Sequence, residues 1–199
     1  MQHVLHAIPS AIIVQHMLHP WLVLAVQLPA APSSARVAAW RRLKQAGAAG
    51  MTNGTWVLPD SPEHQNLLGE IAATVRGQGG EAFLFAAQSL APDEDATVRK
   101  RFEADRNNEY AELAQHSGAF LAELERETSL EKFTFAELEE IEDDFHKLET
   151  WLGKIRPRDF FAGERLQNAC ADMERCRDAL ARFAAEVYAR EGVTGGKND

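Results

Sequence analysis

The first half of the chain alternates continuous apolar runs with amphipathic segments. Residues 21–28 form an apolar run with β-branched side chains, which is typical of a buried strand. Apolar side chains then recur at helical spacing at Val37, Trp40 and Leu43, so we predict a helix that ends at Gly47. Because Trp40 shares this spacing, we expect its ring to lie in the core rather than to serve as a stacking platform.

A hairpin, a second helix and a last strand follow. Asn53-Gly54 lies between two short apolar stretches and predicts a two-residue turn with positive φ at both positions. Residues 60–63, Asp-Ser-Pro-Glu, supply an N-cap, a first-turn proline and an acidic residue for the next helix. The apolar run 82–86 predicts the last strand. The order β-α-β-β-α-β over residues 21–91 therefore predicts a ferredoxin-like α+β domain with one antiparallel sheet backed by two helices.

Beyond Pro92 the pattern becomes long, charged and helical. We expect one helix over residues 94–128, a second that begins after Thr134, and a third that follows Gly163. Thr134 and Glu137 have the spacing of a capping box, which is a strong signal for the start of a helix.

The apolar stripes of these helices indicate how they pack. The stripe of the second helix consists of Leu138, Ile141, Phe145, Leu148, Leu152 and Ile155. Three amphipathic helices cannot bury such stripes alone, so we predict a three-helix bundle over residues 92–191. The residues that follow, 192–199, are expected to form a disordered tail.

Residues 1–20 fit neither half. We interpret them as an N-terminal extension upstream of the gene start, with Met17 as a candidate initiator. They lack the basic region and the cleavage site of a secretory signal, and no stretch of the chain is long enough to span a bilayer, so we expect no membrane contact. Four histidines fall here, but they lack ordered spacing and an acidic or sulfur partner, so we assign no metal site to them. They are His3, His6, His16 and His19.

Charge divides the chain at the same place as hydropathy. The net charge is −9, from 21 Lys and Arg against 30 Asp and Glu. Residues 1–92 hold five basic and four acidic residues, whereas residues 93–199 hold 16 basic and 26 acidic residues. Because the acidic half repels nucleic-acid phosphates, we expect DNA or oxyanion contacts to use the first half or local arginine clusters.

The two cysteines favour a reducing compartment. Cys170 and Cys176 lie six residues apart in a helical stretch, so they point about 120° away from each other and cannot form a disulfide without breaking the helix. Since neither a disulfide framework nor a paired-cysteine zinc site is supported, we expect a cytoplasmic protein.

Basic residues gather at three places along the chain. The first helix offers two serines and four cations for DNA phosphates, because exposed amide groups and the helix dipole add to the positive charge. These residues are Ser33, Ser34, Arg36, Arg41, Arg42 and Lys44. The start of the bundle and its last turn supply a predicted oxyanion set, namely Arg99, Arg101, Arg106, Arg156 and Arg158. The alternative for each group is a solvated, solubilising surface.

Other candidate chemistry is weaker. Glu112 with His116 and Glu142 with His146 lie four residues apart on common helix faces. Carboxylate-bridged metal bundles place Glu and His three apart and add further inward acids, so we predict no metal site. The sequence has no nucleophile elbow, phosphate-binding glycine loop or cofactor motif, and we expect a protein that is not an enzyme and has no cofactor.

Segments in both halves carry a resemblance to one family. In the first half they are Trp21 to Leu24, Gln27 to Pro29, Pro32 to Leu43, Gly47, Val57 to Pro59 and Gly79 to Ala82. In the second half they are Arg106 to Tyr110, Lys132 to Leu138 and Arg158 to Phe161. Over residues 21–190 the chain resembles the N-terminal part of the ChrB chromate-resistance regulators. Longer members of that family continue into a separate C-terminal domain, which is expected to be missing here.

The resemblance implies a chromate-responsive, DNA-binding transcriptional regulator of chromate efflux genes. Its expected partners are promoter DNA, the chromate oxyanion and a second copy of the chain, since an operator with two half-sites suits a twofold dimer. The first domain is also similar in pattern to PaaX-type repressors and to small CRISPR-associated nucleases. Gln27 stands where those nucleases need an acidic residue, which argues against hydrolysis.

Two alternatives remain open at this point. One is an interaction module without DNA contact that works with a separate partner in chromate resistance. The other is a metal-dependent or chromate-reducing enzyme, for which the sequence offers no nucleophile, redox pair or cofactor motif.

Overall fold

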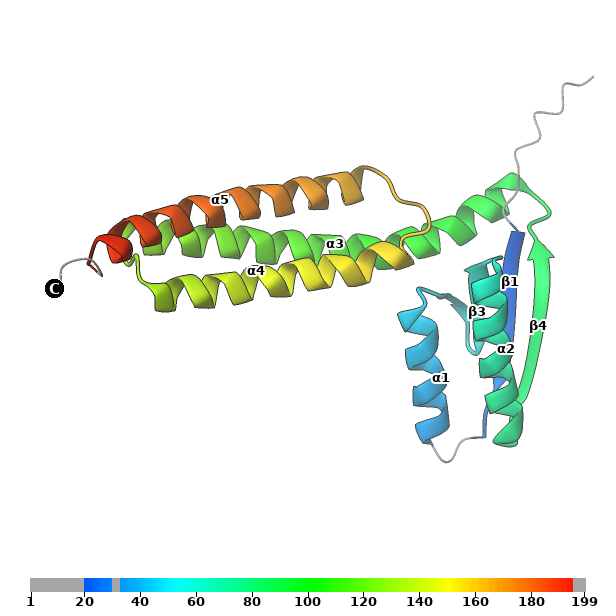
Figure 1. The fold of residues 1–199 in the computed structure, drawn as a ribbon. Coiled ribbons are helices and arrows are strands. Elements are labelled where there is room, and N and C mark those ends of the chain that lie inside the picture. Colours follow the sequence, from blue (N-terminus) through cyan, green and yellow to red (C-terminus); the bar gives the residue numbers. More distant parts are fainter. Residues whose placement is uncertain (1–19, 30–32, 195–199) are drawn as a thin grey trace, which may run out of the picture.

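The structure is a computed structural model, and it describes residues 20–29 and 33–194 (Figure 1). The four N-terminal histidines that lack a predicted metal role, the candidate initiator Met17 and the interpretation of the N-terminal extension lie outside these residues. None of the helices in the described ranges combines the length and the apolar character needed to cross a bilayer.

An antiparallel sheet of four strands forms the core of the first half. Its strands are β1 (Pro20–Gln27), β2 (Ala49–Thr52), β3 (Thr55–Pro59) and β4 (Glu81–Gln88), in the order β2-β3-β1-β4. Helices α1 (Ser33–Gln45) and α2 (Pro62–Gly77) connect these strands. Leu43, Leu68 and Ile71 from the helices share one buried cluster with Leu24 and Leu58 from the strands, so the alternating side chains of the sheet bury one face against the helices.

The helix start predicted at residues 60–63 is confirmed, and the turn is confirmed in part. Ser61 is the N-cap of α2, and its hydroxyl accepts a hydrogen bond from the backbone N–H of His64 at 3.2 Å. The turn joins β2 to β3 as expected, and Gly54 has a φ of +78°. The prediction of a positive φ at Asn53 was wrong. In the described part of the chain, Glu131 is the one non-glycine residue with a positive φ. The pairing of β2 with β3 is irregular between Gly50 and Thr52, so the turn need not follow the regular two-residue geometry.

The expected burial of Trp40 is wrong. Its side chain is 50% exposed and that of Val37 is 41% exposed, whereas Leu43 is 1% exposed. The side of α1 that meets the core carries Leu43 and the small residue Ala39, and Ala46, directly after the helix, packs against the same core. Trp40 lies about 60° and Val37 about 120° around the helix from Leu43, which places both beside the buried stripe rather than on it.

Three long helices make up the second half. They are α3 (Pro92–Ser129), α4 (Phe135–Ile155) and α5 (Glu164–Thr194), and a short 3₁₀ helix, η1 (Arg156–Arg158), follows α4. The helices run side by side (Figure 1) and share one apolar core. All six predicted stripe residues of α4 are buried in it.

The ends of these helices test two sequence predictions. Thr134 is the N-cap of α4, and its hydroxyl accepts a hydrogen bond from the N–H of Glu137 at 3.3 Å, as the capping-box pattern predicts. The predicted tail begins too early, because α5 continues to Thr194. Residues 195–199 lie outside the described part of the chain.

Helix α3 contributes to both cores. Near its start, Phe102 stacks on Trp21 of β1 with ring centroids 5.6 Å apart and an interplanar angle of 10°. The indole N–H of Trp21 donates to Asp95 of α3 at 2.9 Å in a buried hydrogen bond. Farther along, Leu113 and Leu124 belong to the core of the three helices. One continuous helix thus connects the sheet to the helical half, and the division predicted at residues 91 and 92 remains a prediction.

Candidate oxyanion site at the junction

Arg42 and Lys44, two predicted DNA-contacting cations of α1, are engaged in ion pairs with neighbouring helices. Arg42 Nη2 lies 2.6 Å from Glu70 Oε2 of α2, and Lys44 Nζ lies 2.6 Å from Asp105 Oδ2 of α3. Lys44 Nζ also lies 6.0 Å from the ring centroid of Trp56. These contacts tie α1 to its neighbours and occupy the charges that a phosphate would need.

Of the remaining members, Ser33, Ser34 and Arg36 lie in the first turn of α1, and Arg41 lies in its second half. Ser34, Arg36 and Arg41 are exposed, while Ser33 begins the helix and its side chain is outside the described atoms. Arg36 and the exposed ring of Trp40 line a hollow of about 380 Å³ at the end of the sheet. This side of α1 therefore combines positive charge with an exposed aromatic ring.

Two arginines of the predicted oxyanion set converge on one carboxylate. Arg106 Nη1 lies 2.9 Å from Glu109 Oε2 on the same helix, and Arg158 Nη1 of η1 lies 3.1 Å from Glu109 Oε1. The Arg106 side chain is only 6% exposed. Burial lowers the pKa of the Arg106 guanidinium, the Glu109 carboxylate opposes this shift, and the charge of Arg158 adds to it. The ion pair leaves Arg106 Nη1 and Glu109 Oε2 without a well-aligned hydrogen bond to any described residue.

Arg158 also packs directly against the sheet half. A Cβ atom added to Gly47, in the turn after α1, would lie 2.8 Å from Arg158 Cβ. The guanidinium of Arg158 is also held by α4, because its Nε donates a hydrogen bond to the carbonyl of Lys154 at 2.8 Å. The same residue thus links α1, α3 and the end of α4.

A polar hollow of about 240 Å³ lies beside this cluster. Arg106 and Arg165 line it together with three carboxylates, and Tyr110 donates a hydrogen bond to Asp159 at 2.9 Å. The remaining lining residues are Glu103, Asn107, Phe161, Gly163 and Glu164. The lining has three acidic groups and two cations, so its net charge repels anions. An anion would therefore enter only by binding the arginines in place of a carboxylate.

The other predicted oxyanion ligands are placed differently. The guanidinium carbon of Arg99 lies 4.7 Å from the ring centroid of Phe161, which itself lines the hollow. Arg101 and Arg156 are exposed and are not among the residues that line it. The structure brings Arg106 and Arg158 together, places Arg99 nearby, and leaves Arg101 and Arg156 on the surface.

The sequence interpretation missed the groups that organise this site. Glu109 holds the two arginines, Asp159 accepts from Tyr110, and Gly47 contacts Arg158. The spacing of Arg106 and Glu109 was a signal, because residues three apart face each other on a helix. Nothing local in the sequence indicated that Arg158 would meet Glu109.

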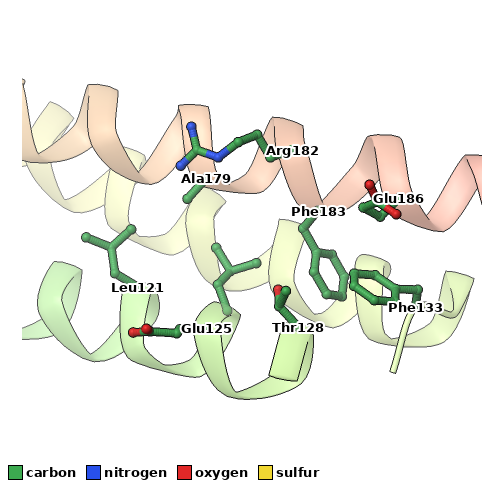
Figure 2. A pocket seen from close by; sticks show the side chains of 9 residues that line it. Leu121, Glu125, Thr128, Phe133, Ala179, Arg182, Phe183 and Glu186 are labelled. Carbon is green, nitrogen blue, oxygen red and sulfur yellow. The ribbon is translucent and has the colours of Figure 1, made fainter. Parts of the chain in front are cut away.

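A second buried carboxylate with two cations lies near the other end of the helices, where Glu127 is 2% exposed and pairs with Arg126 and Lys132. A hollow of about 420 Å³ lies between α3 and α5, toward the end of the helices remote from the sheet, and Figure 2 shows the side chains that line it. Phe133 and Phe183 face each other there with ring centroids 5.3 Å apart, and none of the predicted DNA or oxyanion ligands lines the hollow. In the described ranges no three His, Cys, Asp or Glu side chains are grouped as metal ligands.

These features define a class of protein. Proteins of this class join a small α+β sheet domain to a helical region through one continuous helix. Two arginines that pair with the same glutamate lie at the junction. Comparison with known proteins identifies the family. The model described as "Protein ChrB, N-terminal" matches residues 36–194, so the chain belongs to the ChrB N-terminal family, and the resemblance noted from the sequence is confirmed.

A curated relative supports this assignment. Protein ChrB from Cupriavidus metallidurans (strain ATCC 43123 / DSM 2839 / NBRC 102507 / CH34) is 34% identical over 92 residues. The aligned region is 46% of this chain and 28% of that relative. The match thus covers less than a third of the relative's length.

Proposed function

We propose that this chain acts in chromate resistance as a chromate-responsive transcriptional regulator that contacts promoter DNA in the cytoplasm. The observation that carries the proposal is the convergence of Arg106 and Arg158 on Glu109 beside a polar hollow. Membership of the ChrB family supports chromate as the anion, because longer members of the family respond to it. The proposed role requires no catalytic step, metal or cofactor.

We interpret the two halves as a ferredoxin-like domain and a three-helix bundle. Antiparallel pairing throughout the sheet, in the order β2-β3-β1-β4 with helices before β2 and after β3, supports the first interpretation. The apolar core shared by α3, α4 and α5 supports the second. The proposed anion site then lies between the two units, where ligands can change how units sit together.

A tetrahedral dianion would act by competing with Glu109. Guanidinium groups bind oxyanions through two parallel hydrogen bonds, and Arg106 and Arg158 both address the same carboxylate. An entering chromate would release Glu109 and take over Arg158 while Arg106 stays in place. The acidic residues of the hollow oppose weakly bound anions, so the exchange favours an anion that engages both arginines.

The contacts of Arg158 and Asp105 offer a route from this site to α1. Arg158 packs on Gly47, and Asp105, next to Arg106 in sequence, holds Lys44 near the end of α1. A shift of Arg158 on anion binding would therefore move the end of α1. In this proposal α1 carries the DNA-contacting Arg36 and Arg41.

The proposed DNA surface uses the exposed Arg36 and Arg41, since Arg42 and Lys44 are in ion pairs. One phosphate contact from each of Arg36 and Arg41 predicts an affinity that falls with salt with a logarithmic slope of about −2 per chain. We expect Arg36→Gln combined with Arg41→Gln to weaken binding to a promoter fragment, measured by fluorescence anisotropy at low salt. Arg182→Gln on α5 is the matched control. A binding curve unchanged by the double substitution would remove DNA contact through α1 from the proposal.

The anion site is tested by thermal unfolding with chromate against sulfate. A ligand selective for the folded state raises the melting temperature, so chromate should stabilise the natural chain more than sulfate does. Arg158→Gln should abolish this difference, whereas Arg156→Gln, exposed and two residues away, should retain it. Glu109→Gln should increase the apparent affinity for chromate about 10-fold, because the competing carboxylate charge is gone. Equal stabilisation of the natural chain and Arg158→Gln would refute the site.

A second candidate is an interaction module that acts through a separate partner. A hollow of about 560 Å³ between α3 and α4 favours it, because Phe120, Ile141 and Trp151 line this hollow together with Glu123 and Lys147. The excess of carboxylates in residues 93–199 also favours protein over DNA as the partner. A cognate partner that binds the purified chain while promoter DNA does not would support this candidate over the first.

A further inference from the structure

Strand β4 presents an unprotected edge. It lies at one end of the strand order and pairs with β1 along all eight residues without an irregularity. No other strand of the described ranges lies on its free side. Outer strands are usually shielded by charged residues, proline or bulges. In β4 the one charged residue is Glu81 and no proline occurs, so its backbone groups remain open to pairing.

The face of β4 away from the helices is aromatic. Phe83 and Phe85 are 54% and 55% exposed, whereas Leu84 between them packs against the core shared with the helices. The neighbours of these phenylalanines on β1 are Ala25 and Val23. An apolar strip thus continues from β1 onto the edge strand, and such exposed patches mark interaction surfaces.

We propose that two copies of this chain pair through β4, antiparallel and centred on Leu84. Residues directly opposite each other in an antiparallel pair point to the same face. A twofold axis at Leu84 then places Phe83 opposite Phe85 of the second copy and Phe85 opposite its Phe83, which gathers four rings on one face. Cross-strand aromatic pairs of this kind stabilise a sheet.

The distribution of charge favours a second copy of the chain as the occupant. In this register Glu81 faces Ala87 of the second copy, so the two Glu81 carboxylates do not oppose each other. Residues 1–92 are almost neutral, with five basic and four acidic residues, whereas the rest of the chain is strongly acidic. Figure 1 shows β4 on the side of the sheet away from α4 and α5, so pairing there keeps the acidic helices of two copies apart.

The register can be tested with charge pairs. Sedimentation of the full chain over a range of concentrations should show a monomer–dimer equilibrium. Phe83→Glu combined with Phe85→Glu puts glutamates opposite glutamates and should raise the dissociation constant at least about 100-fold. Phe83→Lys combined with Phe85→Glu should remain dimeric, because each introduced lysine faces an introduced glutamate of the other copy. Leu130→Glu, at a 54% exposed position after α3, should leave the dimer unchanged.

Three outcomes would overturn the pairing. They are a chain that stays monomeric up to about 100 μM, a dimer that survives the double glutamate change, and equal dissociation of both double variants. Circular dichroism with unchanged melting of each variant monomer ensures that loss of the dimer is not loss of the fold. The pairing goes beyond the proposed function and needs neither chromate nor DNA, so its failure would leave the anion and DNA experiments unaffected.

Discussion

Gly47 and Arg158 touch where the sheet meets the helical half. A Cβ atom at residue 47 would lie 2.8 Å from Arg158 Cβ and 3.1 Å from its carbonyl oxygen, and Gly47 has a φ of +78°. The turn after α1 therefore needs glycine twice, once for its backbone conformation and once for its close approach to η1. This contact connects the helix proposed to meet DNA with an arginine proposed to meet the anion.

Replacing Gly47 should destabilise the protein more than replacing a comparable glycine. We expect Gly47→Ala to lower the free energy of unfolding by about 2–4 kcal/mol, from left-handed backbone strain together with the clash against Arg158. Gly79→Ala is the control, because Gly79 has a φ of +77° and nothing within 4 Å of an added Cβ. It should cost about 1 kcal/mol. Urea denaturation measures both, and equal losses would contradict a packing role for Gly47.

The buried hydrogen bond from Trp21 to Asp95 should matter for stability. Asp95→Ala leaves the indole N–H without its 2.9 Å partner inside a stacked aromatic cluster, so we expect a loss of about 1–3 kcal/mol. Asp93→Ala, at an exposed position in the same first turn of α3, should cost only a few tenths of a kcal/mol, roughly the loss of a dipole interaction. Thermal unfolding of the two variants gives the comparison, and similar melting temperatures would show that the bond contributes little.

The hydroxyl of Tyr110 should resist ionisation. Burial and the hydrogen bond to Asp159 raise the pKa of Tyr110 above its ordinary value of 10.0. Because the folded-state pKa lies above the unfolded-state value, this contribution to stability is full below about pH 10 and falls as the pH rises further. In a Tyr188→Phe variant, Tyr110 is the remaining tyrosine of the two in the chain. Absorbance of tyrosinate should then appear only together with unfolding; reversible ionisation near pH 10 in the folded protein would contradict the prediction.

The two cysteines should react at different rates. Cys176 is fully buried, its thiol lies 3.7 Å from the carbonyl oxygen of Ser117, and burial raises its pKa. Cys170 is half-buried. A thiol reagent at neutral pH should label Cys170 first and Cys176 at least about 100-fold more slowly, since the thiolate is the reactive form. Cys170→Ser should remove the fast phase; two equally fast phases would show that Cys176 is accessible.

The predictable part of the fold depends on short-range signals. The cap at Ser61, the capping box at Thr134 and the stripe of α4 each involve residues within a few turns of one another, and all three appear in the structure as predicted. Trp40 was misplaced because helical spacing shows which residues share a face, not which face the rest of the protein covers. Which side of α1 is exposed depends on how that helix packs against α2 and the sheet, and the local sequence does not show this.

The sequence by itself determined where helices and strands form, because hydrophobic periodicity and caps act between near neighbours. It also showed that the acidic charge belongs to the helical half. Only the tertiary structure decided which cations are paired: Lys44 meets Asp105 across 61 residues, and Arg158 reaches Glu109 from another helix. Such pairs depend on distances of a few ångströms between elements, and no local pattern encodes that geometry.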